Sequence, residues 1–349
     1  MSKKKIPFLN QAPVTEPAYI PKDEDFVFKE NNDISIDKNY ASQGYWKGVI
    51  VRFFKKKRPT IGLIIVLVII VFALIGPVVS GYGNTEIISA TVDGRQVTAS
   101  SIKPRIPWLH KLFTGEEYDD PFADYTFVFG TDTVGRDLFT RTANGARISL
   151  LIAFVTIIID MIIGMSYGLI SGYFGGVSDA VMQRIVEIIY SIPRLVIVSV
   201  LATFMPKGVW LVIVALLLTE WIGMSKISRA EMMRMKDQEC ILASRTLGAK
   251  SGRIIFRDVL PNTIGPIITQ VMFSIPIAIF TEAFLSFVGV GIVLPQCSVG
   301  SLIEDGFNNI TTIPYQIIPP IIILALLMLG FNFIGDGLRE ALSPSIEDM

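Results

Sequence analysis

The chain has 349 residues, of which 51% are hydrophobic and 18% are charged, whereas a typical soluble domain carries about 25% charged residues. Its 31 basic and 31 acidic residues cancel, so no overall basic field favours nucleic acid as a partner. Several long stretches nearly lack charge, and the segments between them are crowded with it. This distribution predicts an all-α protein that crosses a membrane several times.

The N-terminal segment, residues 1–58, is predicted to be a tail rather than a folded domain. The stretch up to about Tyr45 is polar and mixed in charge, so we expect it to have no packed core of its own. The first membrane helix follows at 59–80. The run from Thr60 to Ser80 contains no charge, and a helix needs about 20 mostly apolar residues to cross the hydrocarbon core.

Five further apolar stretches bring the predicted number of membrane helices to six. The segment 81–147 precedes them and is long enough for a small subdomain, in which Trp108 to Phe113 is a candidate interfacial helix. The five stretches run from Ile148 to about Tyr173, from about Ile185 to Met205, from Val209 to Met224, from about Ile264 to Val293 and from about Ile313 to Ile334.

Basic residues beside the spans predict the orientation, because Lys and Arg are enriched in cytoplasmic loops. Five of them lie between Arg52 and Arg58, immediately before the first span, which places the N-terminus in the cytoplasm. Six spans return the tail 341–349 to the same side. The loop 226–262 between the fourth and fifth spans holds eight more Lys and Arg residues and is therefore expected in the cytoplasm. The loop 288–312 holds no Lys or Arg and is expected outside, as is the segment before the second span.

Charged residues inside the spans form a second group of candidates. A charge at mid-bilayer costs roughly 2.5–3.5 kcal/mol on insertion scales, so these side chains are expected to line a water-filled path or to contact a partner subunit. Glu187 and Arg194 are seven residues apart, which predicts one helix face. For Glu187 a position at interface depth is the alternative. The candidates are Asp160, Glu187, Arg194, Glu220 and Glu282.

The loop 226–262 has the pattern of two short helices joined by a turn. Ile241 to Leu247 are good helix formers, and a glycine directly after a helix, here Gly248, commonly takes the left-handed conformation that ends it. Ser251 is positioned to cap a second helix. Pro261 is expected to break that helix just before the fifth span.

The sequence offers no catalytic, cofactor or metal site. Gly130 to Asp137, G-T-D-T-V-G-R-D, matches the glycine spacing of a phosphate loop, but Arg136 and Asp137 replace the phosphate-binding Lys and the Mg²⁺-binding hydroxyl. The single histidine, His110, cannot form a metal site alone. Cys240 and Cys297 are predicted to lie on opposite sides of the membrane, so no disulfide follows.

The stretch from Gln238 to Asn262 resembles the cytoplasmic signature loop of bacterial ABC import permeases, E-A-A, three residues, G, nine residues, I, one residue, L-P. Three places hold other residues, since Leu242 replaces the leading Glu, Ser244 the second Ala and Asp258 the Ile. Small residues and the glycine turn are kept. The resemblance implies that the loop couples to ATPases through Leu242, Ala243, Ser244, Arg245, Gly248, Ala249, Leu260 and Pro261.

Three other segments are similar to the C-type subunits of oligopeptide and dipeptide permeases. They are F-G-T-D-T-V-G-R-D-L-F-T-R-T-A-N-G-A-R-I-S-L at Phe129–Leu150, E-A-F-L-S-F-V-G-V-G at Glu282–Gly291 and G-D-G-L-R-E-A-L-S-P at Gly335–Pro344. The resemblance therefore implies a type I importer core over 148–340, with five helices.

Such a permease implies an importer of five proteins in the cell membrane. An external peptide-binding protein delivers peptide, this chain and a second permease form the path, and two cytoplasmic ATPases bind ATP and Mg²⁺. The chain itself is expected to bind no cofactor and to catalyse nothing. Two alternatives remain: a permease of the same type for nickel or another small solute, and a passive channel or membrane scaffold that has no ATPase partners.

Overall fold

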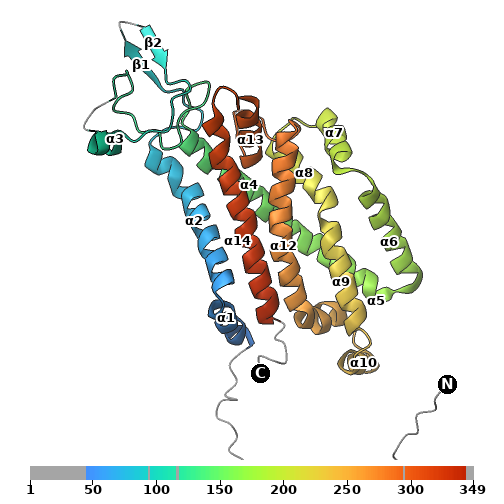
Figure 1. The fold of residues 1–349 in the computed structure, drawn as a ribbon. Coiled ribbons are helices and arrows are strands. Elements are labelled where there is room, and N and C mark those ends of the chain that lie inside the picture. The colour runs from blue at the N-terminus through green and yellow to red at the C-terminus, as the bar shows by residue number, and fades with distance from the viewer. Residues whose placement is uncertain (1–44, 93–94, 115–117, 294, 343–349) are drawn as a thin grey trace, which may run out of the picture. The chain divides into compact units, whose positions relative to one another are not determined.

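The computed structural model describes residues 45–92, 95–114, 118–293 and 295–342. The predicted polar tail before Tyr45 and the last residues of the predicted C-terminal tail lie outside this part. The described residues from Trp46 onward form one compact unit, a bundle of helices (Figure 1).

Five of the described helices are long and apolar enough to span a membrane, and a bent pair makes six if it counts as one span. The pair is α6 (Gly176–Ser191) and α7 (Arg194–Phe204), bent by 81° at the break. The five are α2 (Lys57–Ser80); α4 (Leu138–Ile159), which continues through the π-helical turn η3 (Asp160–Met165) into α5 (Ser166–Phe174); α8 (Val209–Thr219) with α9 (Trp221–Met235); α11 (Ser251–Arg253), which continues through the π-helical turn η4 (Ile254–Val259) into α12 (Leu260–Phe287); and the 3₁₀ turn η5 (Pro314–Ile317) with α14 (Ile318–Leu342).

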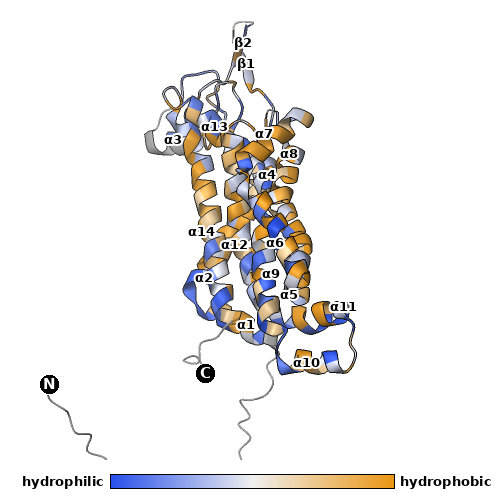
Figure 2. Cartoon of the chain, turned by 90° about the vertical axis from the view of Figure 1, so that its right-hand side faces the viewer, coloured by the Kyte–Doolittle hydropathy of each residue, from blue (hydrophilic) through white to orange (hydrophobic). Residues whose placement is uncertain are grey.

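Burial along α2 shows how such a helix meets both protein and lipid. Its buried residues recur at intervals of three and four, at Gly62, Val66, Ile69, Ala73 and Gly76, and face α4 and α14. The other side of the helix is also apolar but exposed, as a surface against hydrocarbon requires. Figure 2 shows hydrophobic residues dominating the helices between the two ends of the bundle.

Three glycines bring η3 and α5 into backbone contact with α9. Gly164, Gly168 and Gly172 are spaced four apart and so lie on one helix face. A Cβ atom added at Gly168 would lie 2.1 Å from the carbonyl oxygen of Ser225, and the other two meet α9 backbone oxygens at 2.4 and 2.8 Å. This is the small-residue packing that lets membrane helices approach closely.

One end of the bundle carries a small subdomain built mainly from the segment predicted to lie outside. It contains the antiparallel hairpin of β1 (Ser89–Val92) and β2 (Arg95–Thr98) and the helix α3 (Pro107–Thr114), which confirms that a helix forms at the predicted position. Its core is Ile88, Ala99, Phe122 and Phe127. The helix α13 (Val299–Asn308), which was not predicted, lies at the same end (Figure 1).

The segment that mimics a phosphate loop is a brace at the start of α4. The Asp132 carboxylate accepts hydrogen bonds from Arg136 and pairs with the buried Arg141 at 2.5 Å, and Asp137 caps α4 by accepting the backbone N–H of Thr140. Burial would raise the pKa of Asp132, but the Arg136 N–H and the two Arg charges outweigh it and lower that pKa.

The opposite end holds α1 (Tyr45–Lys55), α10 (Glu239–Thr246) and the end of α14 (Figure 1). We call it the α10 end. α1 was not predicted; it lies across the foot of α2 in both views (Figures 1 and 2). Cys240, which is exposed, belongs to this end, whereas the buried Cys297 lies just before α13 at the other.

Several predicted boundaries were wrong. The predicted third span is broken at Pro193, so Glu187 and Arg194 belong to different helices and do not share a face. Pro261 does not break the helix, because the wider π-helical turn η4 before it lets the helix continue into α12. Ser251 is the first residue of α11 and makes no cap, since Lys250 holds that position.

The second span begins at Leu138 rather than at 148, so the predicted boundary between segment 81–147 and the core falls inside α4. The helix accommodates Arg141 there because Asp132 neutralises its charge.

The glycine contact with α9 generates a test. Gly168→Ala adds only a Cβ atom at a site where the neighbouring atom is backbone, so it should destabilise the protein by about 1–3 kcal/mol, measured as a lower unfolding temperature in detergent. Gly223→Ala on α9 is the control. Its Cβ would come no closer than 3.9 Å to another group, so stability should hold or rise slightly. Equal effects at both positions would contradict the packing.

Candidate functional site

The helix α10 is attached to the bundle by one buried side chain. Ile241 is 2% exposed and packs in a core with Met232 and Met235 of α9, Leu169 of α5 and Ile254 of η4. This core draws residues from three spans, and η4 lies directly against α10. A displacement of α10 would press on all three, because close-packed interiors transmit strain.

The end of α10 has the geometry predicted from the glycine. Gly248 has φ +78°, in the left-handed region that favours glycine. Its N–H donates to the carbonyl of Arg245 (3.0 Å), and the N–H of Ala249 donates to the carbonyl of Ser244 (3.1 Å). These two bonds make a Schellman cap, which satisfies the last helix carbonyls and turns the chain back toward α11.

The outer side of α10 is an exposed surface of mixed character. Leu242, Ala243, Arg245 and Leu247 are all exposed, and Leu247, at the tip beside the turn, is 88% exposed. Leu242, which is 42% exposed, is a second apolar side chain on the surface of this helix. The predicted set omitted Leu247, although its place before a glycine cap was readable in the sequence. The exposed Arg245 also contacts the bundle, because its guanidinium lies 5.4 Å from the centre of the Tyr173 ring of α5.

The remaining predicted coupling residues support this surface. Ser244 and Ala249 are half-buried and form the cap, and Leu260 packs into the core under α10. Pro261 is exposed in the first turn of α12. Of the eight predicted residues, three are therefore exposed on α10, three form its cap, Leu260 packs beneath it and Pro261 is exposed at the start of α12.

A polar brace fixes the neighbouring helices at the α10 end. The Arg229 guanidinium of α9 donates to the Asp179 carboxylate of α6 (2.6 Å from Nε), and Asp179 also accepts a hydrogen bond from the Ser171 hydroxyl of α5. Arg–carboxylate pairs of this kind are strong and directional. The ends of α5, α6 and α9 near α10 are thereby joined.

Three of the predicted path residues come together where α6 breaks into α7, with Asp160 and Glu220 enclosed and the Arg194 side chain partly exposed. Arg194, at the break between α6 and α7, pairs with Glu220 at the junction of α8 and α9 (2.6 Å) and donates to the Thr281 hydroxyl of α12 (3.0 Å). The buried Asp160 begins the turn η3, close enough for the charges of Glu220 and Arg194 to act on it. Its Oδ1 has no hydrogen-bond partner among the residues that the structure describes. We call these residues the Arg194 cluster.

The other two predicted path residues lie apart from this cluster. Glu282 is fully buried in α12, where it accepts hydrogen bonds from the hydroxyls of Ser149 (2.6 Å) and Ser286 (2.9 Å). It therefore fastens α12 to α4. Glu187 is exposed on α6 and pairs with Arg184 one turn earlier. Neither the coupling residues nor the path residues assemble a nucleophile with a base, and no group of three metal-binding side chains occurs within the described ranges.

Comparison with known proteins gives matches over both parts of the chain. Residues 164–348 match the family described as binding-protein-dependent transport system inner membrane component, and residues 44–95 match the N-terminal TM domain of oligopeptide transport permease C. The oligopeptide transport system permease protein OppC of Bacillus subtilis is 38% identical over 87% of this chain and 91% of that protein. The dipeptide transport system permease protein DppC of the same strain is 38% identical over 93% of each chain.

Among solved structures, a chain of the MetNI methionine ABC transporter, in an inward-facing form, aligns over 58% of this chain and 96% of that chain. The alignment has a TM-score of 0.49 and 20% sequence identity.

The Arg194 cluster predicts a specific pattern of stability. Arg194→Leu strands the Glu220 carboxylate beside Asp160 and should lower the unfolding temperature in detergent. Adding Glu220→Gln removes the stranded charge and should restore most of the loss. Arg184→Leu is the control, because both side chains of that exposed pair face solvent and such pairs contribute little. A double variant no more stable than Arg194→Leu alone would contradict the pairing.

Proposed function

This chain belongs to the family of binding-protein-dependent transport system inner membrane components, and on that basis we propose that it is one of two permease subunits of an ATP-driven importer of oligopeptides or dipeptides. The observation that carries the proposal is the 38% identity to both an oligopeptide and a dipeptide permease over most of each chain. The match of residues 44–95 supports the C-type subunit, which leaves a second, related permease to complete the path.

We place the α10 end in the cytoplasm. The basic residues of the loop 226–262 and those before α2 gather at this end, which Figure 2 shows as hydrophilic segments around α1 and α10. Membrane proteins retain Lys and Arg on the cytoplasmic side. The hairpin, α3 and α13 then face outward, where an external binding protein delivers peptide.

Coupling follows from the way α10 is mounted. The exposed face with Leu247 at its tip docks on a cytoplasmic ATPase, and the buried Ile241 carries the displacement into α5, α9 and η4. Two ATPase subunits bind and hydrolyse ATP with Mg²⁺, and this chain has no part in that chemistry. Closure of the ATPase pair biases the bundle between two arrangements, which is how one site drives another in a two-state system.

The Arg194 cluster is the element of the path that such a bias would change. It joins the break between α6 and α7 to α8, α9 and α12 through one guanidinium. A rotation of α9 would alter the contact between Arg194 and Glu220. Two discrete arrangements of this ion pair would correspond to the two states of the bundle that coupling requires. Peptide passes between the two permeases, along the side of this chain where α6 and α7 are exposed.

The cap of α10 tests this mechanism. Gly248→Val places a β-branched residue at φ +78°, at a cost of roughly 1–2 kcal/mol in local backbone strain, and should displace Leu247 from its docking position. Peptide uptake into proteoliposomes containing the assembled importer should be lost, while the variant still inserts and its unfolding temperature falls no further than that of the control variant described next.

Gly81→Val is the matched control. Gly81 ends α2 with φ +73° and, like Gly248, has no group within 4 Å of an added Cβ, but it lies at the other end of the bundle. It carries the same strain and should transport peptide normally. Normal uptake by Gly248→Val would contradict the coupling role.

A further inference from the structure

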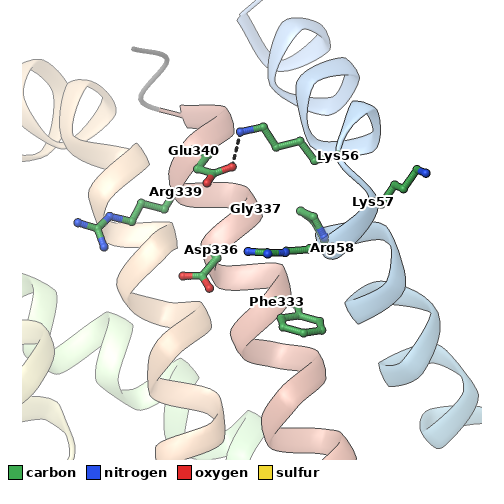
Figure 3. Close-up of a pocket in the computed structure, with 9 residues that line it drawn as sticks. Lys56, Lys57, Arg58, Phe333, Asp336, Gly337, Arg339 and Glu340 are labelled. Carbon is green, nitrogen blue, oxygen red and sulfur yellow. Dashed lines mark hydrogen bonds and ion pairs between the residues drawn. The ribbon is translucent and has the colours of Figure 1, made fainter. Parts of the chain in front are cut away.

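A charged groove lies at the α10 end, between the junction of α1 and α2 and the last turns of α14 (Figure 3). It has a volume of about 710 Å³. Four basic residues and two acidic residues line it, which leaves a net positive charge: Lys56, Lys57, Arg58, Arg339, Asp336 and Glu340. Lys56 pairs with Glu340 at 2.5 Å across the groove, and Arg58 reaches from α2 toward α14.

The groove opens at the level where both helices change from apolar to charged. On α2 the charges end at Arg58, and the helix carries none from Pro59 to Ser80. On α14 the uncharged run ends at Asp336. Such a boundary on two adjacent helices marks the interface between hydrocarbon and headgroups. The groove therefore faces headgroups rather than bulk solvent or acyl chains.

The helix α1 presents an apolar face beside the same groove. Val49 and Phe53 are buried against α2 and α14, whereas Ile50, Val51 and Phe54 are about half exposed. Ile50 and Phe54 are four residues apart and share a side of the helix. A helix that lies across the foot of a span with one apolar side outward and basic residues near its end is typical of helices in the membrane interface.

The basic side chains here exceed the acids available to them. Lys55, Lys57 and Arg58 are exposed, and within the described ranges none of the three takes part in an ion pair. A diester phosphate carries one negative charge and four oxygens, which suits Lys and Arg donors placed at headgroup depth. Its acyl chains would continue along the exposed apolar faces of α1 and α2.

We propose that this groove binds the headgroup of an anionic phospholipid of the surrounding membrane, so that the lipid fills the corner between α1, α2 and α14. This inference goes beyond transport and depends only on the groove and the membrane boundary, so it stands or falls separately from the peptide cargo.

Native mass spectrometry of the assembled importer tests the site. The complex is equilibrated in detergent with equal amounts of phosphatidylglycerol and phosphatidylcholine, and retained lipid is counted. The wild type should keep phosphatidylglycerol preferentially. The triple variant Lys57→Gln, Arg58→Gln, Arg339→Gln should reduce that retention at least about threefold, whereas the charge-keeping variant Lys57→Arg, Arg58→Lys, Arg339→Lys should retain it.

A second triple variant controls for general charge. Lys250→Gln, Arg253→Gln and Arg257→Gln removes three exposed positive charges at the same end but outside the groove, and it should leave retention unchanged. Equal loss in both triple variants, or no preference in the wild type, would overturn the proposal. Displacement of the lipid by excess inorganic phosphate would also overturn it, because the groove would then be a site for free anions.

Discussion

The packing of Ile241 into the core between α5, α9 and η4 is the contact through which α10 is joined to the spans. Without this contact, α10 could be displaced by bending of the chain on either side of it, and the spans would not move. The contact itself depends on the close approach of η3 and α5 to α9, because Gly168 lets these helices meet at backbone distance and so fixes where Leu169 and Met232 lie. A small-residue stripe within the membrane thereby sets the position of a surface helix outside it.

The charges within the bundle obey a related constraint. Hydrocarbon offers no partner to a polar group, so each buried charge needs one from the protein. Glu282 has two serine hydroxyls and serves as a fixed joint between α4 and α12. Arg194 instead lies at the sharp bend between α6 and α7 and contacts Glu220 and Thr281 on other helices, and Oδ1 of the nearby Asp160 has no hydrogen-bond partner among the described residues.

The sequence predicted these features unevenly, for physical reasons. The spans and the glycine turn at Gly248 follow from local rules of hydrophobic length and backbone conformation, and the structure confirms the turn. The start of the second span was placed too late because Arg141 is neutralised by Asp132 only after folding. Met232, Met235 and Ile254 are near Ile241 in the chain, but Leu169 is distant, and no local pattern shows that these side chains share one core. The glycines around Gly168 have a local signal, their spacing of four, which places them on one helix face.

The central claim is that α10 docks on an ATPase through the side chain at its tip. Photo-cross-linking tests it directly, with a photoreactive phenylalanine analogue in place of Leu247 and, as control, in place of Phe54 on α1, exposed at the same end. In an importer that hydrolyses ATP on addition of peptide, position 247 should form an adduct with an ATPase subunit, with a yield that changes when hydrolysis is trapped, and position 54 should not. An active importer with no ATPase adduct at 247 would contradict the account.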